Sequence, residues 1–93
     1  MIMPKKLTLR GKVQGVGCRQ YCQSYAEDFG ISGSATNKTD GSVELLLNTD
    51  DNALLKDFNS ALLSNPNNYL FWGRIVDIKI EDYNGRFIGD YVF

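Results

Sequence analysis

The feature that most constrains this fold is a change of hydrophobic period across residues 14–17. Before it, apolar and polar residues alternate from Leu7 to Val13, as in a half-buried strand. After it, apolar residues recur every three or four positions, the spacing that lines one helix face. These are Cys18, Tyr21, Cys22, Tyr25, Ala26 and Phe29. The sequence therefore predicts a strand over residues 5–13 that turns directly into a helix over residues 18–29.

The turn between these two elements has the features of an anion site. Gly15 and Gly17 let the backbone bend sharply and approach a ligand closely. The first amides of a helix lack intrahelical acceptors and lie at the positive end of the helix dipole, so they favour an anion. Arg19 adds a planar set of donors suited to phosphate or carboxylate. An arginine in a first helical turn is also often merely solvated, so the pattern alone leaves both interpretations open.

The next two predicted elements form a hairpin. Alternation over residues 31–36 and 42–48 indicates two strands, the first weakened by its small residues. Between them, Asn37 to Gly41 contains an Asp-Gly pair, which is a strong hairpin signal.

The second half of the chain continues with a helix and further strands. Capping side chains at residues 49–52 predict a helix that ends near Leu63. Residues 74–82 alternate, which predicts a strand, and residues 91–93 predict a short edge strand. The core-facing residues of the longer strand are expected to be Val76, Ile78 and Ile80.

The predicted order is βαββαβ, the ferredoxin-like α+β layout in which an antiparallel sheet carries two helices on one face. Residues 1–93 then form a single domain. In this layout the first and second strands end at the same edge of the sheet. We therefore expect Asn37 to lie beside the turn at residues 14–19.

Composition excludes several functional classes. A net charge of −1 gives no reason to expect nucleic acid or a membrane as partner. The two cysteines lie four positions apart on one predicted helix and do not indicate a disulfide framework, and without any histidine no metal site is indicated. No segment is apolar for long enough to span a bilayer. The expectation is a cytoplasmic monomer without metal or cofactor.

Two blocks of sequence resemble the acylphosphatase family. Residues 13–19, Val-Gln-Gly-Val-Gly-Cys-Arg, are similar to that family's signature Val-Gln-Gly-Val-Gly-Phe-Arg. Residues 30–44 are similar to its Gly-Leu-x-Gly-Trp-Val-x-Asn…Asp-Gly-x-Val-Glu, and the resemblance covers nearly the whole chain. Cys18 and Ser34 replace the usual phenylalanine and tryptophan at two packing positions.

The resemblance implies an enzyme that hydrolyses small acyl phosphates to a carboxylate and inorganic phosphate, with phosphate as a product inhibitor. Arg19 would bind the phosphoryl group and Asn37 would position the attacking water. The implied phosphate-binding residues are Gln14, Gly15, Val16, Gly17, Cys18 and Arg19. The carboxylate is a good leaving group, and phosphoryl transfer depends mostly on positioning and electrostatics, so this chemistry needs no metal.

The same layout allows two alternative functions. A related non-catalytic module would bind phosphate or carbamoyl-phosphate-like ligands. An RNA-binding module with the same layout would need aromatic residues on the central strands for base stacking, and Thr8, Arg10 and Glu44 supply none.

Two local features also have two interpretations. Cys18 is either a small buried replacement for phenylalanine or a reactive thiolate stabilised by the helix start and Arg19. Residues 69–72, Tyr-Leu-Phe-Trp, are either core packing beneath a polar loop or an apolar rim for a partner or substrate.

Overall fold

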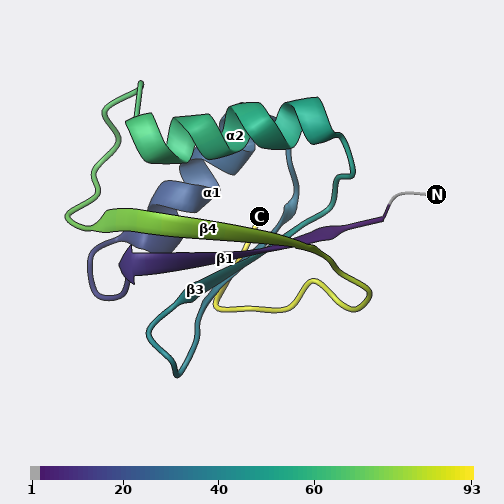
Figure 1. Cartoon of the computed structure of the whole chain (residues 1–93), viewed down its shortest axis with the longest axis horizontal. Helices are drawn as coiled ribbons and strands as arrows, with labels where there is room; N and C mark the ends of the chain where they lie inside the picture. Colours follow the sequence, from purple (N-terminus) through teal and green to yellow (C-terminus); the bar gives the residue numbers. More distant parts are fainter. Residues whose placement is uncertain (1–2) are drawn as a thin grey trace.

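The elements follow each other in the predicted order in the computed structural model, which describes residues 3–93 (Figure 1). They are β1 (Lys5–Lys12), α1 (Cys18–Asp28), β2 (Gly33–Asn37), β3 (Val43–Leu47), α2 (Asn52–Ser64), β4 (Arg74–Asp82) and β5 (Tyr91–Val92). The bounds predicted from the sequence agree with these to within two residues.

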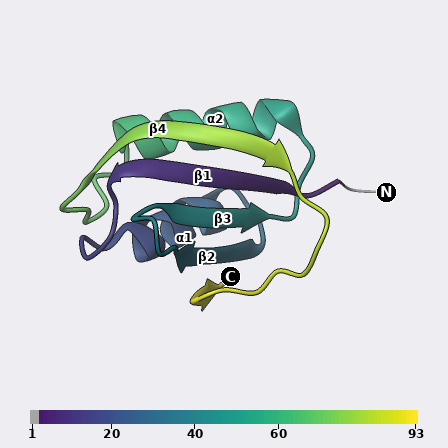
Figure 2. The same cartoon turned by 60° about the horizontal axis from the view of Figure 1, so that its bottom comes forward.

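The sheet has the order β4-β1-β3-β2-β5, and every neighbouring pair is antiparallel. Both helices cover the same face of this sheet (Figures 1 and 2). The ferredoxin-like α+β fold is therefore confirmed. β1 and β2 both run antiparallel to β3, so they end at the same edge of the sheet, and β4 begins there.

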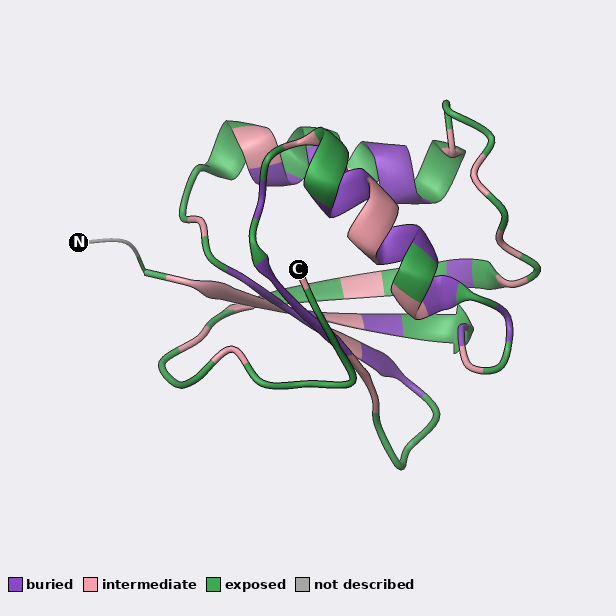
Figure 3. Ribbon diagram, turned by 180° about the vertical axis from the view of Figure 1, so that it is seen from behind, coloured by how far each residue is buried: buried purple, intermediate pink, exposed green. Residues whose placement is uncertain are grey.

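The core lies between the helices and the sheet (Figure 3). Its largest fully buried side chains come from α1, α2 and the two central strands, and they include Leu7, Leu9, Tyr21, Tyr25, Leu45, Leu47 and Phe58. Burying one such leucine contributes about 1.5–3 kcal/mol, so the apolar stripes recognised in the sequence hold the two layers together.

The predicted facing of β4 was partly wrong. The β1–β4 register shifts at Gly11, which pairs with Ile75, so Val76 lies opposite no residue of β1. A bulge of this kind breaks the alternation of a strand. Val76 is consequently 72% exposed, and Ile75 is the buried residue. Ile78 packs partly buried against the core, whereas Ile80 is 45% exposed at the sheet edge.

The segment after β4 crosses the sheet face that the helices leave open (Figures 1 and 3). Ser34 on β2 donates its hydroxyl hydrogen bond to the carbonyl of Ile88 at 3.2 Å, and Leu46 on β3 lines a hollow with Tyr83. Both Ser34 and Leu46 are buried. The chain then pairs β5 with β2, which places Asp90, the residue before β5, beside Asn37.

Candidate active site

The turn between β1 and α1 has the backbone geometry that its glycines predict. Gly15 and Gly17 have φ angles of 72° and 80°, in the left-handed region that residues with a Cβ rarely adopt. Gly17 is the N-cap of α1; within the described residues no side chain caps this helix and its first turn holds no acidic residue. The first N–H groups of α1 therefore lie at its positive end, and no acidic residue of the helix's own first turn pairs with them.

Arg19 extends from the first turn of α1 toward the C-terminal segment. Its Nη1 lies 2.8 Å from Oδ2 of Asp90, and its guanidinium carbon lies 4.8 Å from the ring centroid of Tyr91. The ion pair and the aromatic face together hold a planar cation beside β5.

Asn37, the last residue of β2, lies on the other side of the same carboxylate. Its backbone N–H donates to Oδ2 of Asp90 at 3.1 Å, and this bond, followed by the Arg19 guanidinium, holds the pKa of Asp90 below its ordinary value. Among the described residues, Oδ1 of Asn37 is buried and has no hydrogen-bond partner. An unsatisfied buried acceptor at such a position suits a ligand or a bound water.

Asp90 therefore brings Arg19 and Asn37 to one anionic oxygen, as the topology led us to expect for these two residues. The sequence interpretation missed Asp90 itself. The pattern predicts an edge strand over residues 91–93 but does not indicate which strand it joins. Pairing of β5 with β2 is what brings Asp90 to Asn37, and the Asp90 N–H donates to Oγ1 of Thr36 at 3.2 Å.

The side chain of Gln14 is turned toward the β2–β3 hairpin. Its Nε2 donates to the carbonyl oxygens of Lys38 at 2.6 Å and Ser42 at 2.9 Å. It thereby ties the β1–α1 turn to the hairpin that begins at Asn37. Any contact of Gln14 with an anion in the turn would have to come from its backbone.

Cys18 faces the core. Its side chain is 2% exposed, and its Sγ lies 3.9 Å from Sγ of Cys22, also buried. Burial raises the pKa of the Cys22 thiol. Val16 is buried as well. This burial favours the interpretation of Cys18 as a small buried replacement for phenylalanine. Because the Cys18 side chain faces the core, only its backbone N–H could contact an anion in the turn.

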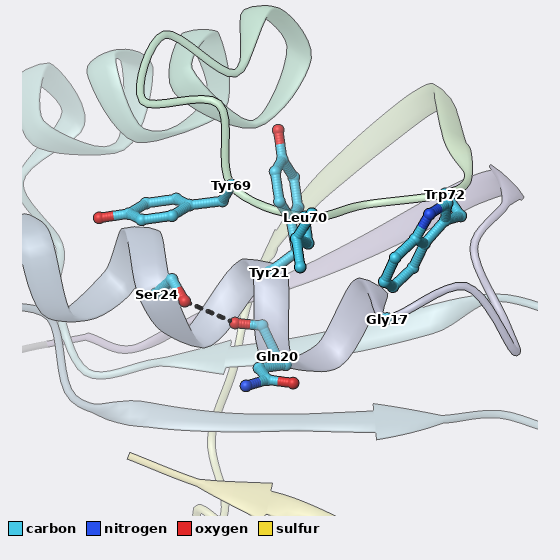
Figure 4. A pocket seen from close by; sticks show the side chains of 7 residues that line it. All are labelled: Gly17, Gln20, Tyr21, Ser24, Tyr69, Leu70 and Trp72. Carbon is cyan, nitrogen blue, oxygen red and sulfur yellow. Dashed lines mark hydrogen bonds between the residues drawn. The ribbon is translucent and has the colours of Figure 1, made fainter.

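Residues 69–72 are divided between the core and the surface. Tyr69 and Phe71 turn inward, and their ring centroids lie 4.8 Å and 4.5 Å from those of tyrosines on α1. Leu70 and Trp72 turn outward and are 74% and 69% exposed. This segment is therefore half core and half exposed apolar surface, next to the start of α1 (Figure 4).

In the part of the chain that the structure describes, neither helix is long and apolar enough to cross a membrane. No three or more side chains of His, Cys, Asp or Glu between residues 3 and 93 cluster closely enough to hold a metal ion.

The sequence and the fold are similar to those of known proteins. The family model described as Acylphosphatase matches residues 5–89. An acylphosphatase of Lactococcus lactis is 32% identical over 82 residues, which cover 85% of this chain and 84% of the relative. An acylphosphatase of Deinococcus radiodurans is 50% identical over 44 residues, and that match spans 51% of the relative's length. The crystal structure of an acylphosphatase from Bacillus subtilis superposes with a TM-score of 0.72 at 27% identity, covering 91% of this chain and 89% of that one.

Proposed function

Because this chain belongs to the acylphosphatase family and is a hydrolase of acyl phosphates, we propose that Arg19 binds the phosphoryl group of the substrate and Asn37 positions the attacking water. The backbone N–H groups of residues 15–19 complete the phosphate site. The Gln14 side chain holds the turn against the hairpin, so it acts on the site indirectly.

One observation carries this proposal. Arg19 and the N–H of Asn37 donate to the same carboxylate oxygen of Asp90, at 2.8 Å and 3.1 Å. A carboxylate oxygen resembles a phosphoryl oxygen in charge and in hydrogen-bonding capacity. Two groups from separate elements therefore already converge on one anionic oxygen.

The proposed reaction is a direct displacement at phosphorus. The water oxygen forms a bond to phosphorus while the bond from phosphorus to the acyl oxygen breaks, and the carboxylate leaves with that electron pair. A phosphoryl oxygen of the substrate accepts the proton of the water. Arg19 and the helix N–H groups stabilise charge on the equatorial oxygens, and the Asn37 amide can accept from the water and donate to the phosphoryl group.

We also propose that the protein acts as a monomer in the cytoplasm and that inorganic phosphate inhibits it competitively. Arg19, Asn37 and the turn lie together within one chain, so the proposed site does not need a second copy. Two free buried thiols suit a reducing compartment. Phosphate would compete because it carries the same oxygens that Arg19 binds in the substrate.

The experiment measures hydrolysis of an aryl acyl phosphate in excess chelator and, separately, the binding of inorganic phosphate. Arg19→Ala should lose nearly all activity and Arg19→Lys most of it, because an ammonium group cannot reproduce the bidentate donor geometry. Asn37→Ala should lower the rate by about 10²-fold, the effect of removing one preorganised donor, and should still bind phosphate. Arg86→Ala, an exposed arginine of the C-terminal segment, serves as the control.

Three results would contradict the assignment. Near-normal turnover by Arg19→Ala would show that the phosphate site lies elsewhere. If Asn37→Ala turned over normally but no longer bound phosphate, Asn37 would bind the phosphoryl group and would not position the water. Binding of phosphate and carbamoyl phosphate without hydrolysis would identify a non-catalytic module.

A further inference from the structure

A groove of about 270 Å³ lies between the start of α1 and residues 69–72 (Figure 4). Its α1 wall includes Gly17, Gln20 and Ser24, and its other wall includes Tyr69, Leu70 and Trp72. The lining is mostly apolar, and two of its apolar side chains, Leu70 and Trp72, are exposed. Pockets for drug-sized molecules measure about 300–1,000 Å³, so this groove suits a smaller group.

The groove begins where the proposed phosphate site ends. Gly17, the last residue of the turn, lines both. The backbone N–H of Trp72 donates to the carbonyl of Val16 at 3.0 Å, and this bond holds residues 69–72 against the turn. The indole lies beside the N-cap, since a Cβ placed on Gly17 would be 3.7 Å from the Trp72 ring.

The sheet order places this groove opposite the proposed water site. β1 lies between β4 on one side and β3 with β2 on the other. Residues 69–73 lead into β4, whereas Asn37 ends β2 at the same edge of the sheet. The turn after β1 is therefore flanked by Asn37 on one side and by Trp72 on the other.

The geometry of in-line phosphoryl transfer predicts where the acyl group of the substrate would lie. The attacking and leaving oxygens lie roughly opposite each other across phosphorus. A water held on the Asn37 side requires the leaving acyl oxygen, and the group attached to it, to point toward residues 69–72.

We propose that this groove binds the acyl group of the substrate and favours acyl phosphates whose acyl group is aromatic or similarly bulky and apolar. This inference rests on the proposed function of Arg19 and Asn37. The exposed indole supplies an aromatic face, and covering Trp72 and Leu70 removes apolar surface from water. A small acyl group such as acetyl would leave most of the groove unfilled.

The test compares benzoyl phosphate with acetyl phosphate in the intact protein and in Trp72→Ala. The variant should lose about fivefold to tenfold in kcat/KM for benzoyl phosphate and stay within twofold for acetyl phosphate. Trp72→Phe should retain most of the preference. Val76→Ala is the matched control, because Val76 is equally exposed but lies on the outward side of the β4 bulge. Affinity for inorganic phosphate should be unchanged in every variant.

An equal loss for both substrates would overturn the proposal, because Trp72 would then act by supporting the turn. No loss for benzoyl phosphate would overturn it as well. Failure of the proposed function is distinct: Arg19→Ala would then keep its activity and its phosphate affinity.

A second measurement needs no turnover. Trp72 is the single tryptophan of the chain, so the intrinsic indole fluorescence reports directly on the groove. With saturating phosphate present, benzoate should change this emission in a saturable manner, and acetate at the same concentration should not. An emission indifferent to benzoate would contradict binding of an aromatic group beside Trp72.

Discussion

At the scale of single residues, the site is notable for an ion pair within its proposed phosphate position. Arg19 and Asp90 lie 71 positions apart in the chain, and both side chains are partly exposed. Exposed ion pairs contribute at most about 1 kcal/mol, so an incoming phosphoryl group can replace the carboxylate on Arg19. With Arg19 in its proposed role, the Asp90 carboxylate would compete with the phosphoryl group of the substrate for the guanidinium.

Asp90→Asn should consequently bind the substrate more tightly. We expect KM for an acyl phosphate and the inhibition constant of phosphate to fall by about fivefold, with kcat within twofold. Asp82→Asn is the control, since Asp82 pairs with Lys5 at the opposite end of the sheet. A lower kcat with unchanged KM would instead make Asp90 a positioning residue for Arg19.

The burial of Cys18 gives a second prediction at this scale. Iodoacetamide should label Cys18 slowly in the folded protein and rapidly in urea, with no protection by phosphate, as mass mapping would measure. Cys18→Phe should lower the free energy of unfolding by about 1–3 kcal/mol, because the core has closed around a small side chain. Rapid labelling that phosphate blocks would mean that the thiol faces the ligand.

At the scale of elements, Gln14 joins the β1–α1 turn to the β2–β3 hairpin beyond the last backbone pair of β1 with β3. Its amide spans from the β1–α1 turn to the hairpin after Asn37. Gln14→Ala should therefore lower kcat by loosening Asn37 relative to Arg19, while phosphate affinity stays near normal. The measurement is a comparison of kcat with the phosphate inhibition constant, with Gln23→Ala on α1 as control. Loss of phosphate affinity in Gln14→Ala would show that this side chain binds the ligand.

The sequence predicted the helices and strands whose starts and spacings are marked by nearby residues, such as capping side chains and periodic apolar positions. Asp51 illustrates this, because its carboxylate accepts from the N–H of Leu54 at 3.1 Å and begins α2 where the capping residues indicated. The bulge at Val76 was missed because the apolar spacing of β4 continues through it. The placement of Asn37 was predictable from strand order, whereas Asp90 depends on a tail that pairs with β2 more than fifty positions away.

At the scale of the whole molecule, the carboxylates of Asp40 and Asp90 make the free energy of unfolding depend on pH in the acidic range. Hydrogen bonds from the Ser42 hydroxyl and N–H, then the charge of Arg10, lower the pKa of Asp40; contacts with Asn37 and Arg19 lower that of Asp90. A lowered pKa in the folded state means that the stabilisation is present above the ordinary value of about 3.9 and is lost as the pH falls through the folded value.

The urea concentration at which half of the protein is unfolded should therefore decrease as the pH is lowered from about 5 to about 3. The double variant Asp40→Asn with Asp90→Asn should show a smaller decrease over the same interval. An identical decrease in both proteins would assign the acid sensitivity to other groups.

The position of β4 at the outer edge of the sheet has a consequence for behaviour at high concentration. An open edge of nine residues offers unpaired backbone groups to a strand of another molecule. β4 carries acidic and basic side chains along its length, namely Arg74, Asp77, Lys79, Glu81 and Asp82. Further copies stacked there in parallel and in register would bring like charges together and remove their water, so this edge resists that form of fibril-like stacking.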